Sequence, residues 1–178
     1  NDAHYVLTPG VQCTTNGFTV SAWVVDANTN DWTMYEGGDI NASYSCIKYD
    51  HLIYSITAQG VQKTALDAAF FAPNTWCHLT MVCTPTQMIV YVDGAYRYKS
   101  VAYTGLDALV RAKYIGRCNI IPGTYSFNGT VDELRVSNAL RSAEWIKACY
   151  NTQQEPGAAL SFMPPERCVT RGTLINLQ

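Results

Sequence analysis

Carboxylates and a Cys-His pair are the side chains of this sequence with the clearest catalytic potential. Asp132 and Glu133 are adjacent in an alternating apolar segment, so on a regular strand they would point to opposite faces. Retaining glycoside hydrolysis needs two carboxylates on one face. Cys77 and His78 would also point to opposite faces of one strand, and His78 is expected to be a core or inter-sheet histidine. The chain contains no Gly-x-Ser-x-Gly elbow, His-Glu-x-x-His helix or phosphate loop. The sequence therefore predicts that the protein is not an enzyme.

Aromatic and acidic side chains alternate closely between residues 31 and 39. Such a segment suits a carbohydrate, because an aromatic ring can stack on a sugar ring while carboxylates accept its hydroxyl groups. We expect this segment to be a loop at one end of the fold. The predicted ligand-binding residues are Trp32, Tyr35, Glu36, Asp39 and, from a second loop, Tyr125. Packing of the same aromatic residues at the rim of the domain is an equally good interpretation.

Composition and charge limit the partners. The 178 residues are 48% hydrophobic and 15% charged, which is enough to build a core in one domain. There are 12 basic and 14 acidic residues, and no basic stripe, so no nucleic-acid partner is expected. No apolar run approaches the ~20 residues of a membrane helix, so no membrane insertion is expected. The seven cysteines are an odd number and cannot all pair within one chain, and most are expected to be buried thiols.

Short alternating segments separated by turn residues predict an all-β fold. Residues 76–83 read as a strand that is apolar on both faces, and Asp93-Gly94 is a strong hairpin signal. Further strands are expected at 18–25, 43–49, 52–56, 88–92, 95–99, 114–116 and 129–136. One helix is expected after Ser142, which can serve as its N-cap. We predict a two-sheet antiparallel jelly-roll sandwich with one short C-terminal helix.

The large apolar residues suggest how this sandwich is filled. Trp23 and Trp76 are expected to anchor the core between the two sheets. The helix is expected to cover an open end of the sandwich, with Trp145 or Ile146 as the buried residue. The jelly-roll domain is expected to span residues 1–163, followed by a tail or connecting segment at 164–178.

Six short motifs occur in an order that resembles a known family. They are Tyr5-Val6, residues 17–24, residues 75–79, residues 90–94, residues 114–116 and residues 127–136, the last leading into 140–146. Together they resemble a laminin-G-like module of the concanavalin A-like lectin/glucanase superfamily, in the form found in bacterial surface proteins. The resemblance covers roughly residues 4–163. Each motif is weak alone, and their shared order makes the resemblance specific.

This resemblance implies a calcium site. Similar modules bind one ion between the first strand region and the aspartate of a motif that reads Gly-Thr-Val-Asp-Glu here. The corresponding residue is Asp132, and Asp2 would lie on the opposite side of the site. Calcium takes six to eight oxygen ligands, so backbone carbonyls and water would complete the shell. The alternative is that Asp132 caps a turn or pairs with Arg135 or Arg117.

The resemblance also implies a function and a location. It indicates a non-catalytic, calcium-stabilised, extracellular, cell-surface or virion-surface module that recognises a glycan or a surface protein, as lectin and cell-adhesion domains do. The alternative is a structural subunit of a surface filament, coat or adhesin. In that case the strand-like Leu160-Ser161-Phe162 would pair with the sheet edge of a neighbouring copy. An ordinary closing strand within the same chain is the simpler interpretation of this segment.

Overall fold

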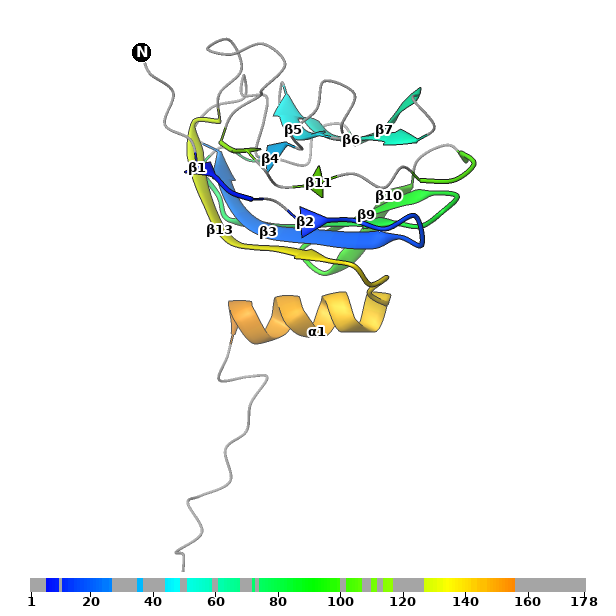
Figure 1. Ribbon diagram of the computed structural model, residues 1–178. Coiled ribbons are helices and arrows are strands. Elements are labelled where there is room, and N and C mark those ends of the chain that lie inside the picture. Colours follow the sequence, from blue (N-terminus) through cyan, green and yellow to red (C-terminus); the bar gives the residue numbers. More distant parts are fainter. Residues whose placement is uncertain are drawn as a thin grey trace, which may run out of the picture.

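Antiparallel strands make up most of the computed structural model, which is shown in Figure 1. It describes residues 6–9, 11–26, 35–36, 44–48, 51–58, 61–67, 72, 74–99, 102–106, 110–111, 114–116 and 127–155. For residues 11, 26, 35–36, 44–48, 51–58, 61–67, 99, 110–111 and 114 it describes the backbone alone. The one helix of this part is α1 (Ala143–Gln154). The strands are β1 (Val6–Leu7), β2 (Val11–Gln12), β3 (Phe18–Asp26), β4 (Tyr35–Glu36), β5 (Tyr44–Lys48), β6 (His51–Ala58), β7 (Val61–Asp67), β8 (Cys77–Cys83), β9 (Met88–Val92), β10 (Ala95–Lys99), β11 (Val110–Arg111), β12 (Tyr114–Ile115) and β13 (Gly129–Ser137).

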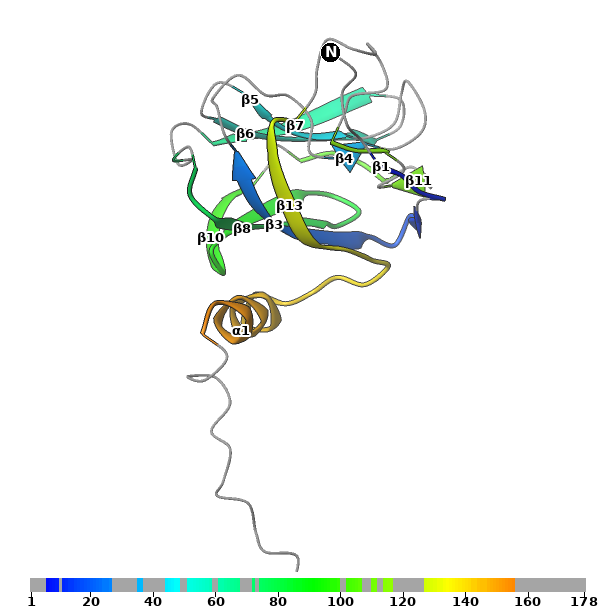
Figure 2. The ribbon, with the colours of Figure 1, turned by 90° about the vertical axis from the view of Figure 1, so that its left-hand side faces the viewer.

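Two antiparallel sheets form the two layers of the fold. The six-stranded sheet has the order β1-β12-β4-β5-β6-β7, and the five-stranded sheet has the order β10-β9-β8-β3-β13. A small third sheet pairs β11 with β2. Figures 1 and 2 show the larger sheets facing each other, with α1 outside the five-stranded sheet. The prediction of an all-β antiparallel fold with one C-terminal helix is confirmed.

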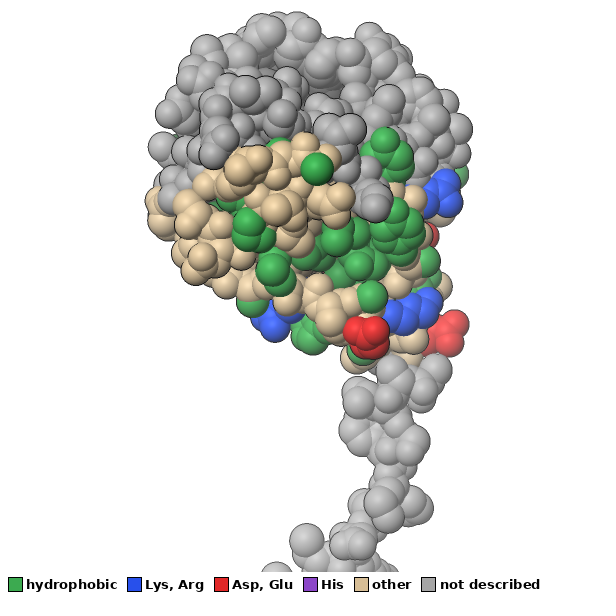
Figure 3. All heavy atoms as spheres, turned by 90° about the vertical axis from the view of Figure 1, so that its right-hand side faces the viewer, with side chains coloured by type: hydrophobic (Ala, Val, Ile, Leu, Met, Phe, Trp, Pro, Cys, Tyr) green, Lys and Arg blue, Asp and Glu red, His purple; other side chains and the backbone are tan. Residues whose placement is uncertain are grey.

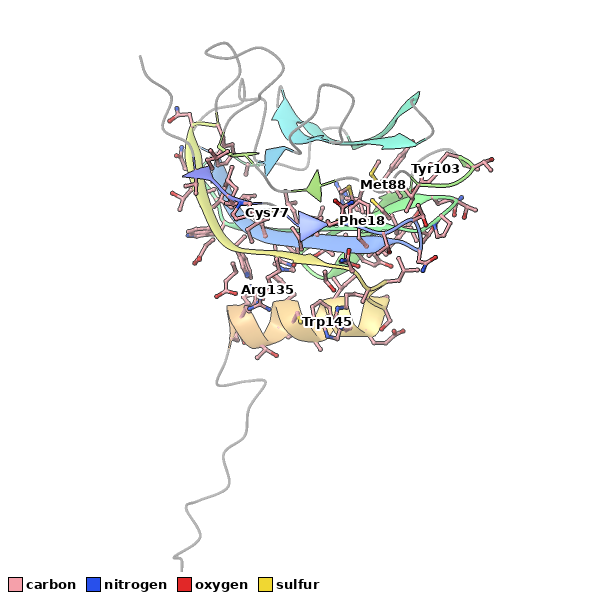
Figure 4. All side chains as sticks on the ribbon, in the orientation of Figure 1. Phe18, Cys77, Met88, Tyr103, Arg135 and Trp145 are labelled. Carbon is pink, nitrogen blue, oxygen red and sulfur yellow. The ribbon has the colours of Figure 1, made fainter. Side chains whose placement is uncertain are left out.

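The core lies on the inner face of the five-stranded sheet. Alternate residues of β3 point into it, and Phe18 and Val24 are fully buried. Leu79 and Met81 of β8 and Met88 of β9 pack against them. Figure 4 shows Phe18, Cys77 and Met88 on this inner side and Arg135 and Trp145 on the side of α1. The alternation of apolar residues along β3 therefore fixes which face of the sheet is internal.

Helix α1 begins where the sequence predicts. The Ser142 hydroxyl caps it by accepting the backbone N–H of Trp145, at 3.2 Å. Ile146 is completely buried and packs on Val82 and Tyr91 from the outer face of the sheet. The expectation that the helix plugs an open end of the sandwich was wrong: α1 lies across the sheet (Figure 2). All seven residues of β8 are buried as a result, with the sandwich on one face and the helix on the other.

The two tryptophans expected in the core lie elsewhere. Trp23 is out of phase with the inward-facing residues of β3 and is half-buried on the outer face of the sheet, beside α1. Trp76 precedes β8 and is 48% exposed. The prediction that both tryptophans lie between the two sheets was wrong, because the apolar character of an indole does not indicate which face of a sheet it packs on.

Two hairpins confirm turn signals of the sequence. Asp93 and Gly94 both adopt positive φ between β9 and β10, as a type I′ turn requires. In the second hairpin β5 pairs with β6, and His51, expected in the turn, instead pairs with Lys48. Strand β7, which pairs with β6, was not predicted from the sequence. The predicted domain boundary at residue 163 lies outside the described residues.

Apolar side chains gather on one side of the molecule. Figure 3 shows this group below the grey region and above the charged side chains at the end where α1 lies. In the described part of the chain, the large apolar residues that are at least 40% exposed are Val6, Leu7, Trp76, Tyr96, Tyr98 and Leu140.

Cys13, Cys77 and Cys83 are buried, as expected. The single described helix is too short to cross a bilayer.

The turn at Gly94 yields a prediction about how the helix docks. A Cβ at this position would lie 3.0 Å from the Tyr150 Cβ and from the Lys147 Cδ of α1, and its φ of +72° disfavours any side chain. We expect Gly94→Ala to lower the free energy of unfolding by about 2 kcal/mol, measured by urea denaturation. The neighbouring exposed Ala95→Ser is the control and should change it by less than about 0.5 kcal/mol. Equal stability of the two variants would show that α1 does not press on this turn.

Candidate functional site

A groove lies on the outer side of the five-stranded sheet, at the C-terminal end of α1. Its volume is about 420 Å³, within the range of roughly 300–1,000 Å³ that small-molecule sites occupy. We call it the tryptophan groove, and its described lining residues are Trp23, Trp76, Asp132, Glu133, Gln153 and Gln154. They come from β3, the segment before β8, β13 and the last turn of α1. The groove therefore forms only where the sheet and the helix meet.

An irregularity in β13 brings two carboxylates into this groove. The pairing of β13 with β3 shifts between Asp132 and Arg135, and Glu133 has a φ of +52°. Both Asp132 and Glu133 line the groove, so the expectation that they point to opposite faces was wrong. The bulge interrupts the alternation on which that expectation rested.

The two carboxylates have different partners. The Asp132 carboxylate accepts the backbone N–H of Glu133 at 2.8 Å. The Glu133 carboxylate forms an ion pair with Arg135, and both of these side chains are about half exposed. Of the alternatives for Asp132, the turn contact is present, the ion pair to Arg135 is made by Glu133, and Arg117 lies outside the described residues. Among the described residues, the Asp132 carboxylate therefore keeps free acceptor capacity toward the groove.

Trp23 joins the sheet to the helix. Its indole N–H donates a hydrogen bond to the Gln153 side-chain oxygen. Its ring stacks on Tyr150 of α1, with centroids 5.6 Å apart and planes at 24°. His78 of β8 lies 5.1 Å from the same indole and 6.1 Å from the Tyr150 ring, so the three rings form one cluster. This aromatic packing holds one wall of the groove in a fixed orientation.

His78 is held in place mainly through its backbone. Its amide donates to an Asp93 side-chain oxygen at 2.9 Å, and its carbonyl accepts the Asp93 amide at 2.8 Å. The side chain is buried, and its Nδ1 has no hydrogen-bond partner in the part of the chain that the structure describes. Burial lowers the pKa of His78 to about 4; the charge of Arg135 also lowers it and that of Asp93 opposes the change. His78 is therefore a neutral packing residue at neutral pH, on the outer side of the sheet.

The thiol next to it is also unreactive. Cys77 is buried on the inner face of the sheet, and burial, followed by the charge of Asp93, raises the pKa of its thiol. Cys77 and His78 lie on opposite faces of β8, as expected, so they form no nucleophile–base pair.

A calcium ion would find oxygen ligands in part of the predicted site. Asp132 is exposed and offers carboxylate oxygens of the type that calcium prefers. No cluster of three or more acidic, histidine or cysteine side chains occurs among the residues with described side chains. Asp2, the other predicted ligand, lies outside the described residues. The calcium site stays a prediction that rests on Asp132.

The predicted ligand-binding residues lie mostly beyond the described part of the chain. Trp32, Asp39 and Tyr125 are outside it. The backbone of Tyr35 and Glu36 forms β4, between β12 and β5, where a loop was expected. These residues stay predictions for a ligand site.

The sequence contains one signal for the tryptophan groove. Phe18, Val20, Ala22 and Val24 alternate along β3, so Trp23 had to lie on the other face. The end of the helix has no such signal, since no glycine or proline follows Gln153 and Gln154 before Pro156. The bulge at Glu133 has no comparable signal, since its positive φ falls on a non-glycine residue.

Comparison with known proteins identifies the family of this chain. A laminin-G family model described as the concanavalin A-like lectin/glucanases superfamily matches residues 1–147. The chain therefore belongs to the concanavalin A-like lectin/glucanases superfamily. Within it, the chain is a member of the laminin-G-like family, as the order of its motifs predicts. No curated protein sequence matches the chain significantly.

Several solved structures share the fold at low sequence identity. The heptameric SAP-like pentraxin from Limulus polyphemus has a TM-score of 0.64 at 14% identity, over 82% of this chain and 75% of that chain. The receptor binding domain of botulinum neurotoxin type G has a TM-score of 0.62 at 10% identity, over 86% of this chain and 46% of that one. For the mosaic serotype C/D domain the TM-score is 0.60, the identity 16% and the coverage 78% and 37%. This chain thus spans less than half of these toxin domains, and the similarity shows the fold.

The buried His78 predicts a stability loss in mild acid. Its pKa is about 4 in the folded protein and 6.5 when unfolded, so below pH 6.5 the unfolded chain binds the proton first. The full contribution of His78 to stability is present above pH 6.5. We expect it to decline between pH 6.5 and 4, by about 3 kcal/mol in total.

Urea denaturation at several pH values measures this loss. His78→Leu removes the titrating group and keeps the other two histidines, His4 and His51, as internal controls. The variant should show a flatter dependence of unfolding free energy on pH across this interval. If the unfolding free energies of the native chain and of His78→Leu depend on pH in the same way, the lowered pKa of His78 is contradicted.

Proposed function

We propose that this domain is a non-catalytic, extracellular recognition module that binds carbohydrate or the surface of a partner. The observation that supports this most directly is Trp76, whose side chain is 48% exposed at the edge of a groove with a polar rim. An exposed indole beside carboxylates and amides suits stacking and hydrogen bonding with a ligand. Membership of a lectin-type family and the fold of two receptor binding domains agree with this function.

Binding fits the groove better than hydrolysis does. Asp132 and Glu133 share the groove, but both are exposed, and Glu133 pairs with Arg135. In the described part of the chain, the buried Cys77 and His78 lie on opposite faces of β8, and neither lines the groove. We therefore assign a binding role to Asp132. Calcium, with Asp2 as its proposed second ligand, is one proposed occupant of this carboxylate, and a cationic group of the partner is the other. The two exclude each other at Asp132.

Screening on arrays tests this function. The purified chain is applied to a glycan array and to a peptide array, with calcium and with EGTA. We expect binding in one of them, lost in Trp76→Ala and retained in Tyr98→Ala, which removes another half-exposed aromatic ring. Loss in Trp32→Ala would instead place the ligand at the predicted loop site.

The calcium contribution is read from the same experiment. If Asp132 holds calcium, EGTA weakens binding by the native chain and has no effect on Asp132→Asn. Binding that EGTA leaves unchanged rules out calcium at this carboxylate. The recognition function is wrong if neither array shows binding, or if binding survives Trp76→Ala and Trp32→Ala together.

Strand β1 favours a second candidate function, assembly through terminal strands. It is the outermost strand of the six-stranded sheet as described, and Val6 and Leu7 are 57% and 60% exposed. An outer strand with apolar side chains is a template for strand addition. The proposed incoming strand is the segment at 160–162, from the same or a neighbouring copy.

Light scattering after size exclusion checks the assembly. We expect oligomers whose size grows with concentration, and their loss when residues 158–178 are deleted. Val6→Lys should act like the deletion, and Leu140→Lys, which changes an exposed residue away from β1, should not. A monomer at every concentration would rule this function out.

A further inference from the structure

Asp132 supplies an available acceptor in the tryptophan groove. Its carboxylate accepts one backbone N–H, while a carboxylate offers about four lone-pair sites. The Gln153 oxygen, in contrast, already accepts the Trp23 indole N–H. A ligand that donates hydrogen bonds would therefore meet its acceptor at Asp132.

The charges around the groove favour a cation. None of its six described lining residues is basic, and two are acidic. Arg135 offsets Glu133 by pairing with it, so Asp132 carries the remaining negative charge. The carbonyl end of α1, where a helix carries partial negative charge, also lies here, and the last turn of α1 contains no basic residue.

The ionisation of a neighbouring residue agrees with this sign of the field. Tyr150 stacks behind Trp23. Burial raises the pKa of Tyr150, and the negative charges of Asp93 and Glu155 raise it further, together with Cys77.

The indoles add a surface that binds cations through their faces. Trp76 is half exposed, and tryptophan is the strongest aromatic partner for a cation within about 6 Å. The chain already uses this interaction on α1. Arg141 lies 4.5 Å from the centre of the Trp145 ring, and Lys147 lies 5.1 Å from that of Tyr150.

We propose that the tryptophan groove binds an arginine side chain of a protein partner, stacked on Trp76 and hydrogen-bonded to Asp132. A guanidinium is planar, so it can stack on an indole while donating two parallel hydrogen bonds to one carboxylate. The ammonium group of a lysine is not planar, so it cannot stack on an indole and donate two parallel hydrogen bonds in this way. A neutral sugar would also stack on Trp76, but it carries no positive charge to pair with the Asp132 carboxylate. This inference rests on the proposed recognition function and specifies its ligand.

Nuclear magnetic resonance of the indole N–H groups tests this assignment in the full chain. The probe is Nα-acetyl-arginine methylamide, and its matched control is the citrulline analogue, which has nearly the same shape and no charge. We expect saturable shifts of the Trp76 signal at roughly millimolar concentration with arginine and none with citrulline. The affinity should fall as salt is added.

Variants separate the contributions of the groove. Trp76→Ala should abolish binding, judged from the Trp23 signal, and Asp132→Asn should weaken it about fivefold or more. Tyr98→Ala should bind like the native chain. If Trp76→Ala does not fold, the exposed and isosteric Asp132→Asn still decides the outcome, with circular dichroism as the check on folding.

The outcomes distinguish this inference from the function on which it rests. Equal shifts with citrulline, no shift with arginine, or full affinity in Asp132→Asn would overturn the arginine assignment. Shifts of Trp76 with cellobiose or maltose but not with arginine would overturn it and leave the recognition function standing. If the glycan and peptide arrays also show no binding, the arginine assignment and the recognition function are both wrong.

Discussion

The packing of α1 against the outer face of the five-stranded sheet is the interaction on which the other features depend. Ile146 is fully buried against Val82 and Tyr91, and burial of such a side chain contributes about 1.5–3 kcal/mol. Without the helix, the outer face of β8 would expose His78, Thr80 and Val82 to solvent. The same contact positions Gln153 beside Trp23, so the stability of the outer layer and the shape of the groove have one origin.

Local patterns in the sequence predicted the elements well, because each depends on near neighbours. Asp93-Gly94 makes a turn through its own backbone preferences, and Ser142 caps α1 through a contact three residues away. The sequence indicates less clearly what covers each face of a strand. A strand that is apolar on both faces, such as 77–83, indicates two buried faces but does not say whether a sheet or a helix covers each.

The candidate site was predicted less completely, because it depends on contacts between distant segments and on one local irregularity. Trp23 and Gln153 are 130 positions apart and meet only after the helix docks. The bulge in β13 reverses the face of Glu133, and no glycine marks it. Asp132 was singled out through the family resemblance as an ion ligand, whereas the structure shows it beside two indoles. The residue type marked Asp132 as a binding residue, but the sequence did not indicate which side chains lie around it.

The family pattern and the groove have different limits along the chain. The match to the family ends at residue 147, inside α1, which continues to Gln154. Trp23, Trp76 and Asp132 lie within the matched region, while Tyr150 and Gln153 follow it. One wall of the groove thus lies within the matched region, and the other is supplied by the end of α1 that follows it. A substitution in this last turn of α1 would reshape the groove and its selectivity without any change in the sheets.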